Sequence, residues 1–468
     1  MSVEAHLDRI SFTSERRARE RIRVMTRRKV GREAKALLSL AWPLALASIG
    51  HNIIGFVDTA MVGRLGANEL AGVAAANAVF FTLSVVGMGL AAGLDPIVSQ
   101  AVGAGEGRRV RAALKAGLII ALVASLPLIA GAMFAPRLLV HAGVSSAITD
   151  RAVEFSLARA PGLLPFVLVM TLRSYFQARG STRPLLVSAI VANVVNISLN
   201  VVLIFGVPSL SIPAMGVLGS GIASTVAYVA QVGVLTLALR RLAPLPDSGR
   251  GDVGIRDVTR LGIPIAVSYA AEVFAFAGVG IFAGRLGAES LGGHQIALQY
   301  ASLSFTSALA ISSATSTRVG HAVGRGDKPA AVLSTSVGIV GGLACMVFSA
   351  GAFLMFAEPL ARLASDQPGI IAVSASLLLI AASFQIFDGL QILAGGALRG
   401  LGDTKTAQRA NLLGYYAVGL PLAAALGFGF GLGVEGLWWG LSAGLGAISV
   451  LLLTTLVRLL KQPLQRTA

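Results

Sequence analysis

The sequence predicts an all-α membrane protein with twelve transmembrane helices in two six-helix bundles, related by an internal parallel repeat. Three observations lead to this fold class. First, 55% of the 468 residues are hydrophobic and 13% are charged, whereas a soluble domain carries about 25% charged residues. Second, twelve apolar stretches approach the roughly 20 residues that a helix needs to cross a bilayer. Third, a set of sequence landmarks occurs twice at a constant spacing.

The twelve predicted helices form two sets of six, separated by a polar break. The first set covers residues 37–62, 69–98, 112–134, 151–172, 184–207 and 215–239. The second set covers residues 258–283, 291–318, 330–356, 370–393, 407–430 and 434–456. The break between them holds Pro244, Pro246 and Gly249, which interrupt helices.

The landmarks of the first set recur in the second. The first copy carries Pro43, residues 64–67 (RLGA) and residues 101–103 (AVG). The second copy carries Pro264, residues 285–288 (RLGA) and residues 322–324 (AVG), each 221 positions later. An even number of helices in each half gives both copies the same orientation. We therefore expect two bundles facing each other across a central cleft.

The distribution of basic residues predicts the orientation, because cytoplasmic loops collect Lys and Arg. With the N-terminus inside, the inner segments hold 32 of the 38 Lys and Arg residues. We predict a basic cytoplasmic tail over residues 1–36, an N-lobe over 37–240, a cytoplasmic linker over 241–257, a C-lobe over 258–460 and a cytoplasmic tail over 461–468. No apolar segment of signal-peptide length follows the first basic residues. A start of translation at Met25 is an alternative to a genuine tail.

Composition and motifs exclude several classes of protein. The net charge of +16 is spread over short breaks between apolar runs and forms no single basic patch, which argues against a nucleic-acid partner. The one cysteine, Cys345, allows no disulfide or cysteine-based metal site within the chain. No phosphate-binding G-x-x-x-x-G-K-[ST] segment occurs, so there is no sign of an ATP-driven motor.

Three acidic residues lie inside predicted spans, namely Asp58, Glu272 and Asp388. A charged side chain in the middle of a bilayer costs roughly 2.5–3.5 kcal/mol, so such residues are functional candidates. The alternative for each is a structural hydrogen bond to a neighbouring helix. Asp95 precedes Pro96, and we interpret it first as the start of a helical turn.

Polar side chains recur at helical spacing on four predicted helices, so each set shares one face. These sets are Asn193, Asn196 and Asn200; Ser224, Tyr228 and Gln231; Gln295, Gln299, Ser302 and Thr306; and Phe384, Asp388 and Gln391. One polar stripe is explained by contacts between helices, whereas four stripes with three acids suggest a hydrated pathway. Carboxylate, amide and hydroxyl oxygens suit a hard cation or a proton. His51 lies seven residues before Asp58 and is either a proton relay or a structural residue.

Residues 37–460 resemble the multidrug and toxic compound extrusion (MATE) family. The segments that carry the resemblance are residues 55–63 (GFVDTAMVG), 100–105 (QAVGAG), 294–298 (HQIAL) and 398–404 (LRGLGDT). Glu272-Val273 and residues 388–391 (DGLQ) resemble the NorM-type branch. The resemblance implies a monomeric, multi-pass protein of the bacterial inner membrane that needs no cofactor and is not an enzyme.

The resemblance also implies a secondary antiporter that exports amphipathic, mostly cationic organic compounds in exchange for Na⁺ or H⁺. The implied coupling residues are Asp58, Asn196, Asn200, Glu272 and Asp388, with a hydroxyl from Ser224 or Thr225. Na⁺ would bind at Asp58, Asn196 and Asn200, or at Glu272 and Asp388. The side chains expected near the substrate are His51, Asn193, Gln295, Gln299, Tyr300, Phe384 and Gln391.

Two other functions fit parts of the sequence. A lipid-linked oligosaccharide flippase of related fold would need basic residues in its cleft to hold pyrophosphate, and Arg159 and Arg173 are the residues that fit. A membrane-embedded enzyme would need a nucleophile with a base, or a metal cluster, and no H-E-x-x-H segment occurs. Pro43 and Pro264 are either bending points or first-turn residues of their helices.

Overall fold

The computed structural model describes residues 4–249 and 251–467. Over this part of the chain the backbone is almost entirely helical, and the only strand-like pairing is one isolated bridge between Val207 and Ile212. The predicted all-α fold class is confirmed.

The N-lobe contains the first six transmembrane segments and several short helices. Its elements are α1 (Glu4–Val62), α2 (Ala67–Ala92), α3 (Leu94–Gly103), α4 (Gly107–Phe134), η1 (Ala135–Ala142), α5 (Ser146–Arg159), η2 (Ala160–Gly162), α6 (Leu163–Ala178), α7 (Arg183–Phe205), η3 (Pro208–Leu210) and α8 (Gly216–Arg241).

The C-lobe contains the second six. Its elements are α9 (Ile255–Arg285), α10 (Ala288–Arg325), α11 (Lys328–Ala364), α12 (Pro368–Leu401), α13 (Lys405–Leu412), η4 (Leu413–Gly419), α14 (Leu420–Ala424), η5 (Ala425–Gly429) and α15 (Gly433–Lys461). Both η4 and η5 are π-helical turns inside the eleventh segment.

Eleven helical segments of the described chain are long and apolar enough to cross a membrane. The twelfth long helix is α10, which has 38 residues. It is less apolar because Ser, Thr and Gln occupy much of its length, as the polar stripe in the sequence indicates. The predicted set of twelve helices therefore corresponds to the observed set.

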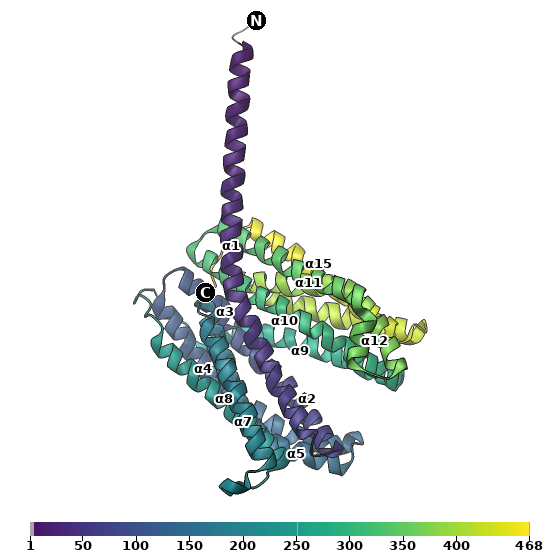
Figure 1. The fold of residues 1–468 in the computed structure, drawn as a ribbon. Coiled ribbons are helices and arrows are strands. Elements are labelled where there is room, and N and C mark those ends of the chain that lie inside the picture. The colour runs from purple at the N-terminus through teal and green to yellow at the C-terminus, as the bar shows by residue number, and fades with distance from the viewer. Residues whose placement is uncertain (1–3, 250, 468) are drawn as a thin grey trace.

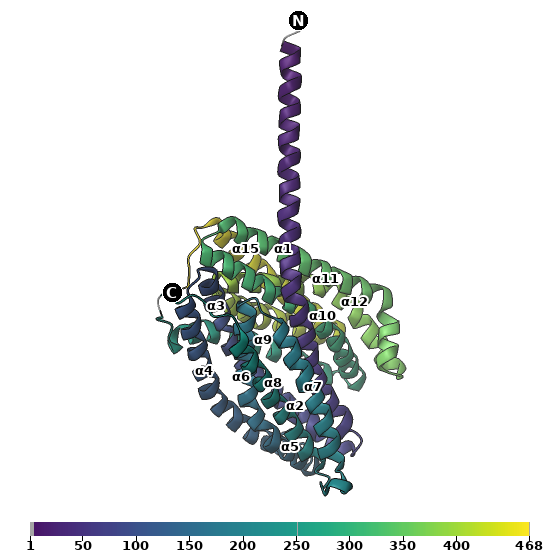
Figure 2. The same cartoon turned by 60° about the vertical axis from the view of Figure 1, so that its left-hand side comes forward.

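The boundaries differ from the prediction in three places. Helix α1 begins at Glu4 and runs through most of the predicted tail, and Figures 1 and 2 show it extending away from both lobes. The second predicted helix is divided at Gly93, and the fourth at residues 160–162. Pro161 explains the second division, because proline cannot donate to the helical ladder and clashes with the preceding turn. Pro43 and Pro264 lie inside α1 and α9 and not in a first turn, which excludes that interpretation.

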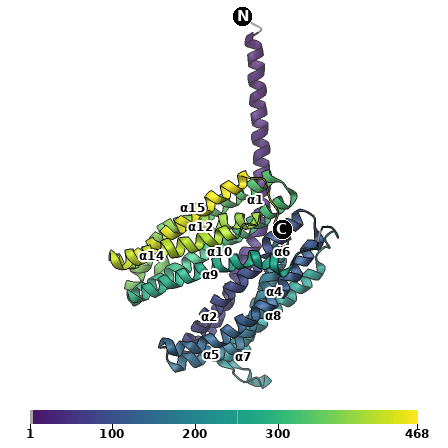
Figure 3. The same ribbon diagram turned by 180° about the vertical axis from the view of Figure 1, so that it is seen from behind.

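The two lobes meet near the C-terminus and diverge toward the opposite end (Figures 1 and 3). Each lobe has its own apolar core, built from small residues and a few large rings such as Phe166 in the N-lobe and Trp438 in the C-lobe. Large apolar side chains, including Phe56 and Phe348, remain exposed on the outside. Such surfaces are expected where lipid covers the protein.

Glycines let the lobes touch closely where they meet. A Cβ on Gly93 would lie 2.5 Å from the Val258 carbonyl oxygen and 2.8 Å from Gly262 Cα, both in α9. Gly103 in α3 and Gly324 in α10 likewise face the backbone of the opposite lobe. Small residues at membrane helix interfaces permit this approach, and the junction is therefore tightly packed backbone against backbone.

Candidate functional site

A cavity of about 820 Å³ lies between the lobes. Its walls come from α1, α2 and α6 of the N-lobe and from α9, α10 and α12 of the C-lobe. Most of the lining is apolar, and two acids, Glu272 on α9 and Asp388 on α12, belong to it. The predicted central cleft is therefore present, and it has the size and apolar walls of a small-molecule site.

Five of the predicted candidates line this cavity: His51, Gln295, Phe384, Glu272 and Asp388. Four others do not line it: Asn193, Gln299, Tyr300 and Gln391. Helical spacing identified residues that share a face, but it could not say whether that face borders the cleft or a neighbouring helix.

Three of these four are held elsewhere by hydrogen bonds. Asn193 donates to the Gly50 carbonyl at 2.8 Å, and the Tyr300 hydroxyl donates to the Leu360 carbonyl at 2.9 Å. Gln391 lies one helical turn from Asp388 and donates to its Oδ1 at 3.4 Å. It lies behind the cleft wall, beside a smaller cavity that Glu272 also lines.

The two C-lobe acids lie in an aromatic environment. The Phe276 ring packs 6.4 Å from Phe384, and Phe384 packs 5.7 Å from Trp438, measured between centroids. Within the described chain neither Glu272 nor Asp388 belongs to an ion pair. The cleft wall thus carries two carboxylates that belong to no ion pair, beside rings that can stack on a cation.

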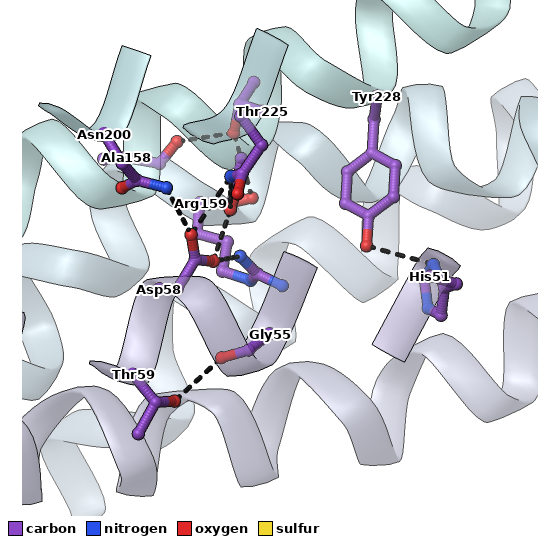
Figure 4. Close-up of polar contacts among 11 residues, drawn as sticks. His51, Gly55, Asp58, Thr59, Ala158, Arg159, Asn200, Thr225 and Tyr228 are labelled. Atoms are coloured by element: carbon purple, nitrogen blue, oxygen red, sulfur yellow. Dashed lines mark hydrogen bonds and ion pairs between the residues drawn. The ribbon is translucent and has the colours of Figure 1, made fainter. Parts of the chain in front are cut away.

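Asp58 lies in a second, separate polar cluster inside the N-lobe (Figure 4). Its side chain is fully buried and does not line the central cavity. Asn196 and Asn200 of α7 donate to its Oδ1 at 3.1 and 2.9 Å. Ser224 of α8 donates to its Oδ2. The sequence-predicted residues Asp58, Asn196, Asn200 and Ser224 are therefore brought together.

The sequence did not predict the fifth member of the cluster. Arg159, the last residue of α5, places Nη1 2.8 Å from Asp58 Oδ2, and both side chains are buried. Its guanidinium also lies over the Phe80 ring, with Cζ 4.4 Å from the centroid. The available signal was that Arg159 lies well inside a predicted span, and a charge there needs a partner.

The two adjacent hydroxyls of α8 have different contacts. Ser224 faces Asp58, whereas Thr225 donates to the carbonyls of Ala158 at 2.9 Å and Arg159 at 3.5 Å. Those carbonyls are left free because the helix is interrupted at Pro161. Thr225 therefore holds the end of α5, and with it Arg159.

His51 contacts aromatic residues and makes no hydrogen bond to Asp58. Its Nδ1 lies 3.5 Å from the Tyr228 hydroxyl (Figure 4). Its ring lies 5.4 Å from that of Phe166. The structure thus provides no direct relay between His51 and Asp58. On the same side of the cleft, Arg173 lines the cavity and donates to Ser48 at 2.9 Å.

Asp95 has a role that the sequence did not indicate. Its carboxylate lies 3.5 Å from Arg399 of α12, and both residues are buried. Nearby, Gln100 donates to the Gly400 carbonyl at 3.1 Å. The interpretation of Asp95 as a helix-start residue is incomplete, because its side chain joins the two lobes.

Comparison with known proteins agrees with this architecture. The family model MatE matches residues 43–202 and again residues 264–425, so the two matches begin 221 positions apart, at Pro43 and Pro264. The chain belongs to the MatE family. The double match of the MatE model reflects the internal repeat that the sequence predicted.

Curated relatives of this MatE family member carry the name NorM. The "Probable multidrug resistance protein NorM" of Bradyrhizobium diazoefficiens is 35% identical over 87% of this chain and 89% of the relative. The "Multidrug resistance protein NorM" of Vibrio cholerae is 31% identical over 92% of this chain and 96% of the relative. This MatE protein is therefore a multi-pass multidrug efflux transporter, and not an enzyme.

Solved structures share the fold. The eukaryotic MATE transporter AtDTX14 superposes with a TM-score of 0.84 at 24% identity, covering 92% of this chain and 96% of that one. A MOP superfamily transporter from Pyrococcus furiosus, described as having a binding pocket of reverse polarity, superposes with a TM-score of 0.81 at 18% identity over 92% of this chain and 97% of that one. The same fold thus carries pockets of different charge, and the substrate that a cleft accepts depends on the residues that line it.

Proposed function

We propose that the protein is a secondary antiporter that exports amphipathic, mostly cationic organic compounds in exchange for Na⁺ or H⁺. The observation that carries this proposal is the pair of carboxylates, Glu272 and Asp388, on the wall of the 820 Å³ cleft. Neither has an ion-pair partner in the described chain. A cationic drug and a coupling ion would compete for the same two groups, and that competition is the basis of antiport.

The shape of the cleft supports an amphipathic substrate. Apolar residues such as Met88, Leu298 and Phe305 line most of it, and they would bury the organic body of the compound. Phe276 and Phe384 lie beside the acids, where a positive charge can be stabilised by ring faces. The charge of the substrate would then be held by Glu272 or Asp388.

The orientation proposed for the protein is the one that the basic residues favour, with both termini in the cytoplasm of a bacterial inner membrane. In that orientation the end where the lobes meet faces the cytoplasm, and the cleft faces outward. A monomer is sufficient for this scheme, because one chain supplies both walls. No bound cofactor is required, since the gradient supplies the energy.

One coupling ion provides enough energy for export. One charge crossing 100 mV gains about 2.3 kcal/mol, and one pH unit adds roughly 1.4 kcal/mol. At about 1.4 kcal/mol per tenfold ratio, the sum supports a gradient of several hundredfold for an uncharged compound. One-for-one exchange with a monovalent cation moves no net charge, so the pH unit alone then supports roughly tenfold.

The residues of the cleft argue against a flippase for pyrophosphate-linked lipids. Of the two arginines that fitted that function in the sequence, Arg159 is paired with Asp58 and lies outside the cavity. Arg173 does line the cavity. Glu272 and Asp388 line the same cavity, and both would repel a pyrophosphate group.

Transport in proteoliposomes tests the proposal. An imposed Na⁺ or H⁺ gradient should drive ethidium movement by the wild type, and Glu272→Gln combined with Asp388→Asn should abolish it. Glu358→Gln is the matched control, because Glu358 is an exposed acid paired with Arg362 on α11, away from the cleft. If neither gradient moves ethidium or a fluoroquinolone with the wild type, or if the double variant transports normally, the antiporter proposal is wrong.

A further inference from the structure

The environment of Asp58 is complete without a metal ion. A carboxylate offers about four lone-pair sites. Asn196 and Asn200 donate to Oδ1, and Arg159 and Ser224 donate to Oδ2. Four donors thus occupy four acceptor sites, and no lone pair of Asp58 remains for a cation.

The negative charge of Asp58 is also already neutralised. Asp58 carries one negative charge and Arg159 one positive charge, and both side chains are almost fully buried. A Na⁺ ion added here would leave a net positive charge in a buried site, and uncompensated buried charge is strongly unfavourable.

Arg159 is held so that it does not move aside easily. Its guanidinium lies 4.4 Å above the Phe80 ring and 5.5 Å from the Phe155 ring. Its backbone ends α5 next to Pro161, and Thr225 fixes the free carbonyls there. The side chain is therefore positioned from both ends.

The neighbouring oxygens would suit a cation if the guanidinium were absent. Hard cations are held by several oxygen ligands. Asp58 offers two oxygens, Ser224 one, and the Oδ1 atoms of Asn196 and Asn200 are buried and have no hydrogen-bond partner. Rotation of the two amides would turn these oxygens toward the position that Arg159 now fills.

We propose that Arg159 is the residue that determines ion specificity in the N-lobe. Its guanidinium fills the cation position at Asp58, so Asp58 binds no Na⁺, and the coupling ion binds at Glu272 and Asp388. The Na⁺ site considered at Asp58, Asn196 and Asn200 does not fit the residues present. The second part of this inference rests on the proposed antiport.

Equilibrium binding of ²²Na⁺ to the full-length purified protein, with choline as the replacing cation, tests the inference without any transport. The first variant leaves the Asp58 cluster unchanged and combines Glu272→Gln with Asp388→Asn. It should bind no Na⁺. Saturable Na⁺ binding that persists in this variant would overturn the inference.

The second test is a gain of binding. Arg159→Gln removes the fixed charge, and it should bind Na⁺ with a stoichiometry near one in the Glu272→Gln/Asp388→Asn background. Adding Asp58→Asn should abolish that binding. Arg159→Lys is the matched control, because it keeps a cation beside Asp58 and should show no gain.

The outcomes are separable. If Arg159→Gln elutes as a monodisperse, folded protein and gains no Na⁺ site, Arg159 is not what excludes the ion. If it does not fold, the first test still decides, because it leaves Arg159 in place. A failure of gradient-driven ethidium transport would refute the antiport proposal and leave both binding results standing.

Discussion

Asp95 on α3 and Arg399 on α12 form a buried ion pair that joins the two lobes, with 3.5 Å between carboxylate oxygen and guanidinium nitrogen. The two residues are 304 positions apart in the chain. The pair lies next to the smaller cavity on the C-lobe side, which Arg399 also lines. It can exist only while the lobes meet at this end, so it favours the conformation seen here over one in which this end opens.

Replacing Asp95 with Asn should shift the protein toward the alternative arrangement of the lobes. Removing one partner leaves a buried charge without compensation, which costs about 3–5 kcal/mol, and opening would expose Arg399 to water. Spin labels can be placed at the starts of α4 and α11, which lie at the end where the lobes meet, after Cys345 is replaced by Ser. Pulsed electron paramagnetic resonance should report longer and broader distances between these labels in Asp95→Asn.

The control for this change is an ion pair that does not join the lobes. Arg362 and Glu358 lie four residues apart on α11 and are both exposed, and such pairs contribute about 0–1 kcal/mol. Arg362→Gln should leave the distances unchanged. Unchanged distances in Asp95→Asn would mean that the glycine contacts alone hold the lobes together.

Those glycine contacts give a second prediction. A methyl group at Gly93 would lie 2.5–2.8 Å from backbone atoms of Val258 and Gly262, and backbone cannot move aside cheaply. Gly93→Ala should therefore separate the lobes at this end and slow transport, with each lobe still folded. Gly341→Ala on α11 is the control, because nothing lies within 4 Å of that position. Circular dichroism checks folding, and ethidium transport checks function; equal transport by both variants would contradict this account.

Much of the fold could be predicted from the sequence because its causes are local or repetitive. Apolar stretches of membrane-spanning length, and landmarks recurring at 221 positions, determine the twelve helices and the duplication. The shared face of Asn196 and Asn200 also follows from helical spacing. These amides do lie on one carboxylate, Asp58.

The contacts between helices could not be predicted in the same way. Asp58 and Arg159 are 101 positions apart, and periodicity within each helix does not give the register between them. The division at Pro161 ends α5 at Arg159. Proline does not always divide a helix in this chain, because Pro264 lies inside the continuous helix α9. Asn193 was expected at the cleft from its helical spacing, and Tyr300 as an aromatic ring for a cationic substrate. Both instead bind backbone carbonyls.

An exposed cluster of charged residues attaches the linker between the lobes to the N-lobe, and this attachment depends on pH. Asp247 lies 3.2 Å from Arg108 Nε and also contacts Arg111. The hydrogen bond from Arg108 holds the pKa of Asp247 below its usual range. A carboxyl whose pKa is lower in the folded state stabilises the fold above its unfolded pKa and loses that effect as the pH falls through the folded value.

The linker should therefore stay attached between pH 5 and 8 and loosen only in stronger acid. Hydrogen exchange of residues 244–249 should be independent of pH in that range, after correction for the intrinsic rate. Asp247→Asn should raise this exchange and leave the pH profile of transport unchanged. A changed profile would show that the linker contributes to proton coupling.

Ser224 and Thr225 provide the last prediction, because adjacent hydroxyls have separate tasks. Thr225 donates to two carbonyls at the end of α5, and a buried acceptor left unsatisfied costs about 1–3 kcal/mol. Thr225→Val keeps the shape and removes the donor, so it should lower the unfolding temperature, whereas Thr225→Ser should restore it. Ser224→Ala should leave ²²Na⁺ binding at Asp58 absent, because Arg159 still fills the cation position. If Thr225→Val unfolds at the wild-type temperature, water satisfies these carbonyls, and Arg159 must be positioned by Asp58 and Phe80 alone.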